Sequence, residues 1–481
     1  MKQSISNTSA FGWSFFENVA ITFINFIIGV ILARLLMPED FGIIGVTAVF
    51  LAILPIFSDG GFGSALIQKK DCTEKDFNSV FYFNILISIA LYVLVVSSSE
   101  YIQSFFEIEE LSSVLNILSI NIIIVSFGSV QSVVITKNLN FKLLSKISVS
   151  SQIISGTLAI SLAYLGYGVW SLVFKTLINS ILTVSLLFLF NSWKPKLIFS
   201  VTALRKLFSF GSNLLMSTLL NRAFDNLYFF IIGKYYSAEK LGFYTRAEML
   251  KNLPSQNLTS VIQRVSFPLL SNIQDNDVSL KENYRKLIRL SVFISSFVLF
   301  FLFATSKSLV PVLFGVKWLP IIPMVQLFCF SAFLYPVHAL NLNILNVKGR
   351  SDLYFRVEII KKILMIPGVL VAIYIGIEEL LVYLIFYSIG CYFINASFGG
   401  KLINYPVKDQ ILDIVPSVIF NLCISFMVFF IGYLSFPAIA LLPLQLVLGM
   451  AILIGAAETI KPYSYVKIKE LVSSKILKSN S

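Results

Sequence analysis

Long apolar segments alternate with short polar connections along almost the whole chain. A helix that crosses a bilayer needs roughly 20 mostly apolar residues, and about fourteen segments of the sequence meet that requirement. They lie near residues 11–33, 43–66, 78–98, 113–135, 147–165, 169–190, 209–232, 247–270, 288–306, 320–346, 357–376, 379–399, 413–433 and 437–458. The eighth is the most polar of them. The pattern predicts an all-α polytopic membrane protein.

Composition supports this class and excludes others. Hydrophobic residues make up 57% and charged residues 13% of the 481 positions, whereas soluble domains are about 45–50% apolar and about 25% charged. The four cysteines are scattered, and the single histidine, His338, cannot build a histidine-based metal site or catalytic triad. No phosphate-binding Walker motif occurs. We therefore expect no cofactor, no metal and no enzymatic activity.

The distribution of Lys and Arg predicts the orientation in the membrane. About 27 of the 37 basic residues fall in one set of alternate connections and about 6 in the other, and the richer set is cytoplasmic under the positive-inside rule. Both termini are therefore predicted to be cytoplasmic. The same rule explains the net charge of +12 without a nucleic acid partner. The basic tail is expected to lie on the anionic leaflet.

Two stretches, residues 11–42 and 210–242, resemble each other. At an offset of 200 the motif positions pair as Arg34 with Lys234, Glu39 with Glu239, and Gly42 with Gly242. Because both copies start on the cytoplasmic side, they indicate a parallel repeat with an axis along the membrane normal.

The repeat predicts two pseudo-symmetric halves. We place the N-terminal lobe at residues 1–200, the C-terminal lobe at 201–405, the two further helices at 406–460 and a basic cytoplasmic tail at 461–481.

Polar residues form a stripe on the first and on the seventh predicted helix. They recur at a spacing of about four, which places them on one helical face. The two sets are Ser14, Asn18, Thr22 and Asn25, and Asn213, Ser217, Asn221 and Asp225. Such stripes face a water-filled cavity or join helices by hydrogen bonds. A shared central cavity is one hypothesis, and bundle cohesion is the other.

Charged residues within the predicted spans need a partner, water or a function. Arg222 and Asp225 lie three residues apart on one helix, so they can pair; alternatively, Arg222 binds a lipid phosphate with its guanidinium fork. Lys251 and Arg264 are candidates for the cavity or for snorkelling to the interface. Lys175 is a further intramembrane cation.

Two carboxylates are candidates for ion coupling. Glu17 lies about two turns into the first predicted span, and Asp59 precedes Gly60, Gly61 and Gly63, where we expect irregular backbone. Backbone of that kind is tolerated at membrane depth only beside protein or water.

Several segments resemble the polysaccharide transporters, which include the Wzx-type flippases of the multidrug/oligosaccharidyl-lipid/polysaccharide superfamily. They are ILARLLMPEDFGIIG at 31–45, LIQKKDCTEKDFNSVFYFN at 66–84, KNLNFKLLSKISV at 137–149, GYGVWSLV at 166–173 and NRAFDNLYFFIIGKYYSAEKLGFYTRA at 221–247. The resemblance covers nearly the whole chain, and the order of the segments is more specific than any one of them.

The resemblance implies a fold of two pseudo-symmetric six-helix lobes plus two C-terminal helices. It also implies an alternating-access flippase of a bacterial inner membrane. It implies that the cargo is an undecaprenyl-diphosphate oligosaccharide for O-antigen, capsule or exopolysaccharide, with Arg222, and with Arg34 and Lys234 at the outer helix ends, as cationic residues for the diphosphate. A glycan polymerase and a chain-length regulator are the further partners expected. The alternatives are a cation-coupled multidrug exporter of the same superfamily, and a membrane glycan polymerase or ligase.

Overall fold

The computed structural model describes residues 2–479, with side chains apart from those of residues 2–11, 210, 213, 214, 471, 472 and 474–479. Within these residues the chain is all helical and divides into two compact units, the first ending at residue 245 and the second beginning at residue 246. The all-α class predicted from the apolar segments is confirmed. The lobe boundary proposed at residue 200 stays a prediction.

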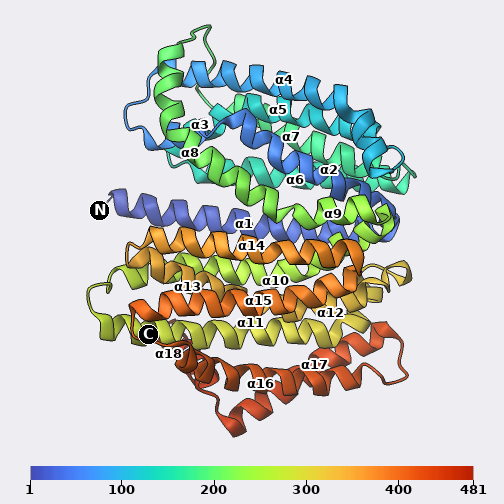
Figure 1. The fold of residues 1–481 in the computed structure, drawn as a ribbon, viewed down its shortest axis with the longest axis vertical. Helices are drawn as coiled ribbons and strands as arrows, with labels where there is room; N and C mark the ends of the chain where they lie inside the picture. Colours follow the sequence, from blue (N-terminus) through green and yellow to red (C-terminus); the bar gives the residue numbers. More distant parts are fainter. Residues whose placement is uncertain (1, 480–481) are drawn as a thin grey trace. The chain divides into compact units, whose positions relative to one another are not determined.

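The first unit contains the helices α1 to α9 and the start of α10 (Figure 1). Their bounds are α1 Lys2–Leu35, α2 Pro38–Asp59, α3 Phe62–Gln68, α4 Glu74–Phe106, α5 Leu111–Lys137, α6 Phe141–Tyr164, α7 Trp170–Phe190, α8 Val201–Asp225, α9 Leu227–Tyr235 and α10 Ala238–Ser271. Helix α4 packs along α5, α1 along α6, and α6 along α7. Helix α8 belongs to this unit because it packs against α2, α3 and α4.

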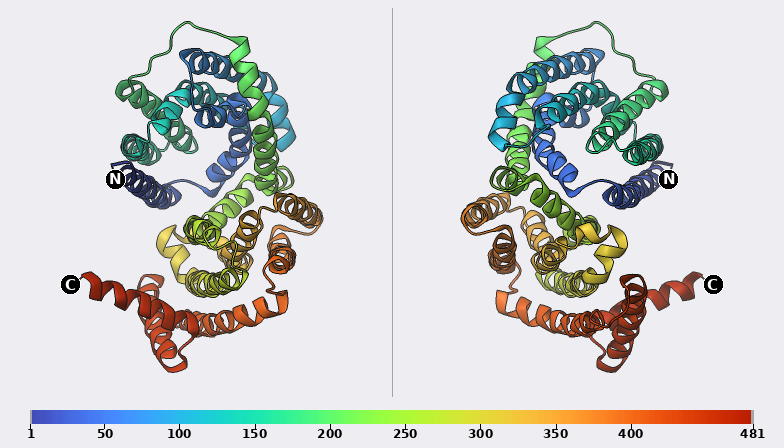
Figure 2. Two further views of the ribbon diagram at one scale, coloured as in Figure 1. Left: turned by 90° about the vertical axis from the view of Figure 1, so that its left-hand side faces the viewer. Right: turned by 90° about the vertical axis from the view of Figure 1, so that its right-hand side faces the viewer.

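The second unit contains the rest of α10 and the helices up to α18. Their bounds are α11 Asp277–Leu313, the 3₁₀ turn η1 Val316–Trp318, α12 Ile321–Ala332, α13 Tyr335–Val347, α14 Ser351–Tyr374, α15 Ile377–Leu402, α16 Val407–Ile431, α17 Ala438–Ile460 and α18 Tyr463–Ser479. Helix α11 is central, because it packs against α12, α13, α16 and α17. Figure 2 shows α16 and α17 side by side.

Each of the fourteen predicted segments falls on a helix or on a broken helix. Eleven spans among the described residues are long and apolar enough to cross a membrane. The segments at 209–232, 247–270 and 357–376 are helical too but are not among those eleven. The protein is therefore a multi-pass membrane protein, although a count of fourteen spans is not confirmed.

Three of the segments predicted as single helices are interrupted. Helix α2 ends at a left-handed pair, with φ of 57° at Gly60 and 78° at Gly61, which agrees with the irregular backbone expected there. The segment 209–232 breaks at Asn226, whose amide donates to the Arg222 carbonyl at 2.8 Å. A side chain that bonds to the backbone in this way competes with the helical ladder. The third interruption lies between α12 and α13.

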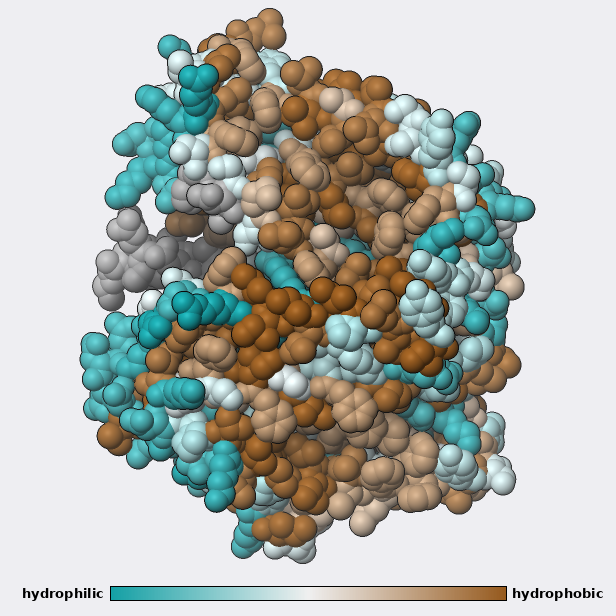
Figure 3. Space-filling view, in the orientation of Figure 1, coloured by the Kyte–Doolittle hydropathy of each residue, from teal (hydrophilic) through white to brown (hydrophobic). Residues whose placement is uncertain are grey.

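Apolar side chains cover the middle of the helices, and polar side chains gather at the helix ends. On the face shown in Figure 3, brown side chains lie along the middle of α4 and α14, and teal side chains lie near their ends. Many large apolar residues are exposed, for example Phe23, Leu86 and Phe386, each with more than 60% of its surface accessible. A surface of this kind suits acyl chains rather than water.

Candidate functional site

A polar group inside the first unit joins three helices. The Gln152 amide on α6 donates to the Asn25 side-chain oxygen on α1 at 2.6 Å. The Lys175 ammonium on α7 donates to the same oxygen at 3.3 Å. Gln152 is 8% exposed, and Asn25 and Lys175 are half-buried. The close packing of α6 on both α1 and α7 brings the three side chains together.

This polar group, Asn25–Gln152–Lys175, can hold an anion or a sugar. Lysine is a compact cation with three donors, and amides both donate and accept. In a bundle with little water, each of these interactions is stronger than at a wet surface. Asn25 was among the predicted cavity residues and Lys175 among the intramembrane charges. Gln152 was missed, because a single glutamine in an apolar helix has no distinctive spacing.

The rest of the predicted stripe on α1 bonds to its own helix. The Asn18 amide donates to the Ser14 carbonyl at 2.8 Å, and the Thr22 hydroxyl donates to the Asn18 carbonyl at 2.7 Å. Asn18 is exposed, and Glu17 is half-buried with no ion pair to another described residue. Asn25 is the residue of this stripe whose side chain contacts other helices, α6 and α7.

The predicted cationic site on α8 lies at the end of that helix. Asn221, Arg222 and Asp225 are all exposed, and α8 ends at Asp225. No ion pair joins Arg222 to Asp225 in the part of the chain that the structure describes. The side chain of Asn213 lies outside the described ones. The stripe therefore stays a prediction as a binding surface.

Asp59 has a clear local contact. Both of its carboxylate oxygens accept from the Gly63 backbone N–H, at 3.1 and 3.2 Å. An acidic side chain at this place satisfies one of the unpaired donors at the start of α3. This contact positions the break between α2 and α3, and a role in ion coupling stays a prediction.

In the second unit, Lys251 on α10 lies in an aromatic cage. Its ammonium is 3.1 Å from a Glu248 carboxylate oxygen and 4.5 and 5.6 Å from the ring centres of Phe328 and Tyr335. The residue is only 4% exposed. Such contacts stabilise a desolvated ammonium. Arg264, further along the same helix, is exposed.

The motif shared by the two repeats lies at the start of α2 and of α10. Glu39 and Glu239 are in the first turns of these helices, where a carboxylate interacts favourably with the helix dipole. Gly42 and Gly242 are buried between the two helices, and Arg34 is exposed at the end of α1.

The basic partner of Arg34 in the repeat has a capping role. The Lys234 ammonium donates to the Phe105 carbonyl at 2.6 Å and to Glu107 at 2.9 Å. Phe105 belongs to the last turn of α4, whose final carbonyls lack helical partners. Lys234 therefore satisfies the end of α4.

A further charged cluster was not predicted. The Asp413 carboxylate on α16 accepts from Arg285 and Arg289 on α11, and from the Tyr405 hydroxyl at 2.5 Å. The Asp413 side chain is 3% exposed, whereas those of Arg285 and Arg289 are 46% and 26% exposed. Arg285 and Arg289 lie four residues apart on one helical face, and this spacing could have indicated the cluster. They were instead interpreted only as basic residues of a connection.

Comparison with known proteins identifies a family that this chain matches. The chain matches the family described as polysaccharide biosynthesis protein over residues 31–323. It is 28% identical to the teichuronic acid biosynthesis protein TuaB of Bacillus subtilis (strain 168) over 345 residues, which are 71% of each chain. It is 26% identical to the lipopolysaccharide biosynthesis protein WzxC of Escherichia coli (strain K12), over 75% of this chain and 73% of that relative.

The fold also resembles a solved structure. The lipid II flippase MurJ, in an inward closed conformation, aligns with a TM-score of 0.74 and 17% identity over 94% of this chain and 98% of its own. At that identity the likeness shows a shared fold.

Proposed function

This chain belongs to the polysaccharide biosynthesis protein family, and from that premise we propose that it is a flippase for a lipid-linked oligosaccharide. The family match, which spans more than half of the chain, carries the proposal. The named relatives act in teichuronic acid and lipopolysaccharide biosynthesis. The fold shared with a lipid II flippase supports transport of a lipid-linked sugar rather than its synthesis.

A flippase must lower the free-energy cost of moving the polar headgroup of its cargo through the bilayer. Moving a charged, hydrated sugar diphosphate through hydrocarbon is prohibitive, while the polyprenyl tail remains stable in lipid. The Asn25–Gln152–Lys175 group supplies a cation and amides inside the first unit. In this proposal it contacts the headgroup during passage from the cytoplasmic to the outer leaflet.

We further propose the membrane in which the protein lies and its orientation there. It lies in a bacterial inner membrane with both termini in the cytoplasm, because most basic residues lie in one set of connections. Its cargo is an undecaprenyl-diphosphate oligosaccharide, and it performs no bond chemistry on that cargo. A glycan polymerase and a chain-length regulator are the partners that would receive the flipped product.

The direct test uses the purified protein in vesicles that contain a fluorescent lipid-linked oligosaccharide. Flipping exposes the label to a membrane-impermeant quencher, and wild-type protein is expected to increase the quenched fraction. Vesicles with the Lys175→Met variant are the comparison. Wild-type vesicles in which the label stays on its original leaflet, with and without an ion gradient, would contradict the proposal. Export of drugs without movement of the lipid would indicate the exporter alternative.

A further inference from the structure

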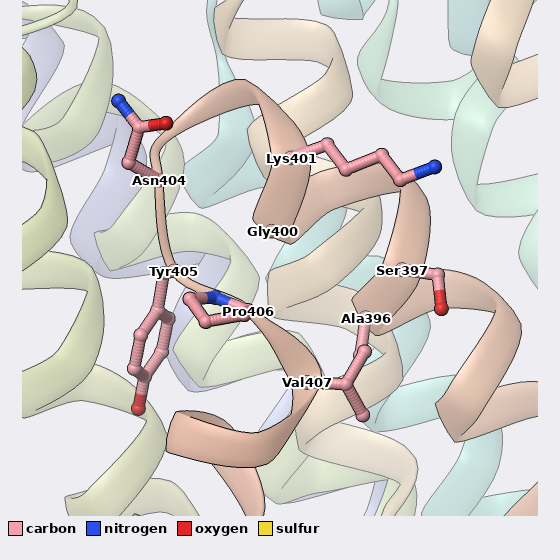
Figure 4. Close-up of a pocket in the computed structure, with 8 residues that line it drawn as sticks. All are labelled: Ala396, Ser397, Gly400, Lys401, Asn404, Tyr405, Pro406 and Val407. Atoms are coloured by element: carbon pink, nitrogen blue, oxygen red, sulfur yellow. The ribbon is translucent and has the colours of Figure 1, made fainter.

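A cavity of about 490 Å³ lies at the turn between α15 and α16 in the second unit. Its lining residues are Ala396, Ser397, Gly400, Lys401, Asn404, Tyr405, Pro406 and Val407. In the close-up of Figure 4, Ala396 and Val407 lie next to each other across the turn, while the side chains of Lys401 and Asn404 extend away from it. We call the apolar lining residues Ala396 and Val407 the floor of the cavity and the polar ones Lys401 and Asn404 its rim.

The rim carries cations that the protein does not neutralise. Lys401 lines the cavity, and Lys408 directly follows the lining residue Val407. Both are exposed, and neither forms an ion pair or hydrogen bond with another described residue. Lys281 lies on the other side of the turn, where its ammonium donates to the Asn404 carbonyl at 2.5 Å. Asp409 is the one acidic residue of the segment 397–409, so the rim has an excess of positive charge.

The apolar floor continues along the surface of α15. Phe386, Ile389 and Phe393 are 67%, 37% and 45% exposed. Their spacing of three and four residues places them on one helical face, which also carries Ser397. This face leads from the middle of the helix to the cavity, so an extended apolar chain could follow it.

The cavity is predicted to lie on the cytoplasmic side of the membrane. Lys401 and Lys408 belong to the connections with most Lys and Arg, which the positive-inside rule places on the cytoplasmic side. The cytoplasmic leaflet carries anionic lipids, and basic pockets between transmembrane helices on that side bind their headgroups.

We propose that this cavity binds an anionic phospholipid of the cytoplasmic leaflet, with its phosphate at Lys401 and an acyl chain along the exposed face of α15. The bound lipid would brace the turn that links α15 to α16. Helix α16 packs chiefly on α11, so the lipid adds contacts where the protein itself supplies few. This site is separate from the one proposed for the cargo and does not depend on the transport function.

The test is native mass spectrometry of the full-length protein in detergent, titrated with phosphatidylglycerol or with phosphatidylcholine of the same acyl chains. Wild-type protein is expected to retain phosphatidylglycerol preferentially. Lys401→Ala should weaken that binding about fivefold, the effect of one surface lysine near an anionic lipid, and leave phosphatidylcholine binding unchanged. The matched control is Lys206→Ala, which removes an exposed lysine of the first unit and should behave like wild type.

Two variants test the apolar part of the site. Val407→Trp and Ser397→Phe fill the cavity from α16 and from α15, and either one should reduce the retention of both lipids. Equal retention of the two lipids by wild type, or unchanged phosphatidylglycerol binding in Lys401→Ala, would overturn the proposal. Displacement of phosphatidylglycerol by undecaprenyl phosphate at equimolar concentration would also overturn it, because the cavity would then select the cargo lipid.

Discussion

Gly42 and Gly242 occupy the same position in the two sequence repeats, and each lies against the backbone of the other copy. A Cβ atom on Gly42 would lie 1.7 Å from the Ala238 carbonyl oxygen, and a Cβ on Gly242 would lie 1.8 Å from the Pro38 carbonyl oxygen. Pro38 and Ala238 also correspond at the offset of 200. The contact is reciprocal, as in a two-fold symmetric interface. The repeat found in the sequence thus coincides with a local pseudo-symmetric contact between α2 and α10.

Substitution of either glycine should therefore separate the two helices. We expect Gly42→Ala and Gly242→Ala each to lower the free energy of unfolding by about 1–3 kcal/mol or more, the usual cost of overpacking, because backbone atoms cannot rotate away. The measurement is the thermal midpoint of the purified protein in detergent. Gly455→Ala is the control, since a Cβ there meets nothing within 4 Å. Equal midpoints for all three variants would show that α2 and α10 are not in close contact.

The Asp413 cluster predicts that a buried ion pair contributes more to the free energy of unfolding than an exposed one. Asp413→Asn removes the acceptor shared by Arg285, Arg289 and Tyr405, and we expect a loss of about 1–3 kcal/mol, as for other buried hydrogen-bonded groups. Denaturant unfolding followed by tryptophan fluorescence measures this change.

The exposed pair of Arg350 and Asp352 provides the control. Its hydrogen bond lowers the pKa of Asp352 to about 2, but both side chains are nearly half exposed. Surface pairs of this kind contribute little, so Asp352→Asn should leave the free energy of unfolding close to that of the wild type. A loss in Asp352→Asn as large as in Asp413→Asn would contradict the structural distinction.

The fold was largely predictable from the sequence, because apolar length and basic connections are local properties. All fourteen predicted segments fall on helices, and the family resemblance is confirmed by the match over residues 31–323. The break at Asn226 was not predicted, since an asparagine is tolerated in many helices and the bond of its side chain to the Arg222 carbonyl depends on the local geometry.

The candidate site was predictable only in part. The stripe on α1 identified Asn25, but its partners on α6 and α7 are 127 and 150 residues away in sequence, and no local pattern relates them. Lys251 was recognised as an intramembrane charge, while its cage requires Phe328 and Tyr335 from α12 and α13. Spacing on one helix reveals a polar face, whereas the choice of partner depends on how the helices pack.

The aromatic cage predicts that the two members of the Lys251–Glu248 ion pair contribute unequally to stability. Glu248→Gln leaves a buried ammonium without its carboxylate, and we expect a loss of about 1–3 kcal/mol. Lys251→Met removes the buried ammonium and leaves Glu248 unpaired, but the Glu248 side chain is 21% exposed and can be hydrated, so we expect a smaller loss than in Glu248→Gln. Thermal unfolding of the two variants measures the difference. Lower stability of Lys251→Met than of Glu248→Gln would contradict this account.

The strongest prediction for transport concerns Lys175. Its ammonium and the Gln152 amide share the Asn25 oxygen in the interior of the first unit. A hydrogen bond to a charged group contributes roughly 1.5–3 kcal/mol, so Lys175→Met should reduce the flipping rate by about tenfold or more if the ammonium binds the headgroup. The rate is measured in vesicles by quenching of the labelled lipid. Lys146→Met is the control, because Lys146 is exposed on α6.

Asn25 provides an independent check of the same site. If the amide positions the ammonium, Asn25→Asp should keep Lys175 in place as an ion pair but neutralise it, and flipping of an anionic lipid should fall although the protein remains folded. Asn25→Leu should release Lys175 and lower both stability and rate. Normal flipping in Asn25→Asp together with normal flipping in Lys175→Met would exclude this group from the cargo path and direct attention to Arg222 on α8 instead.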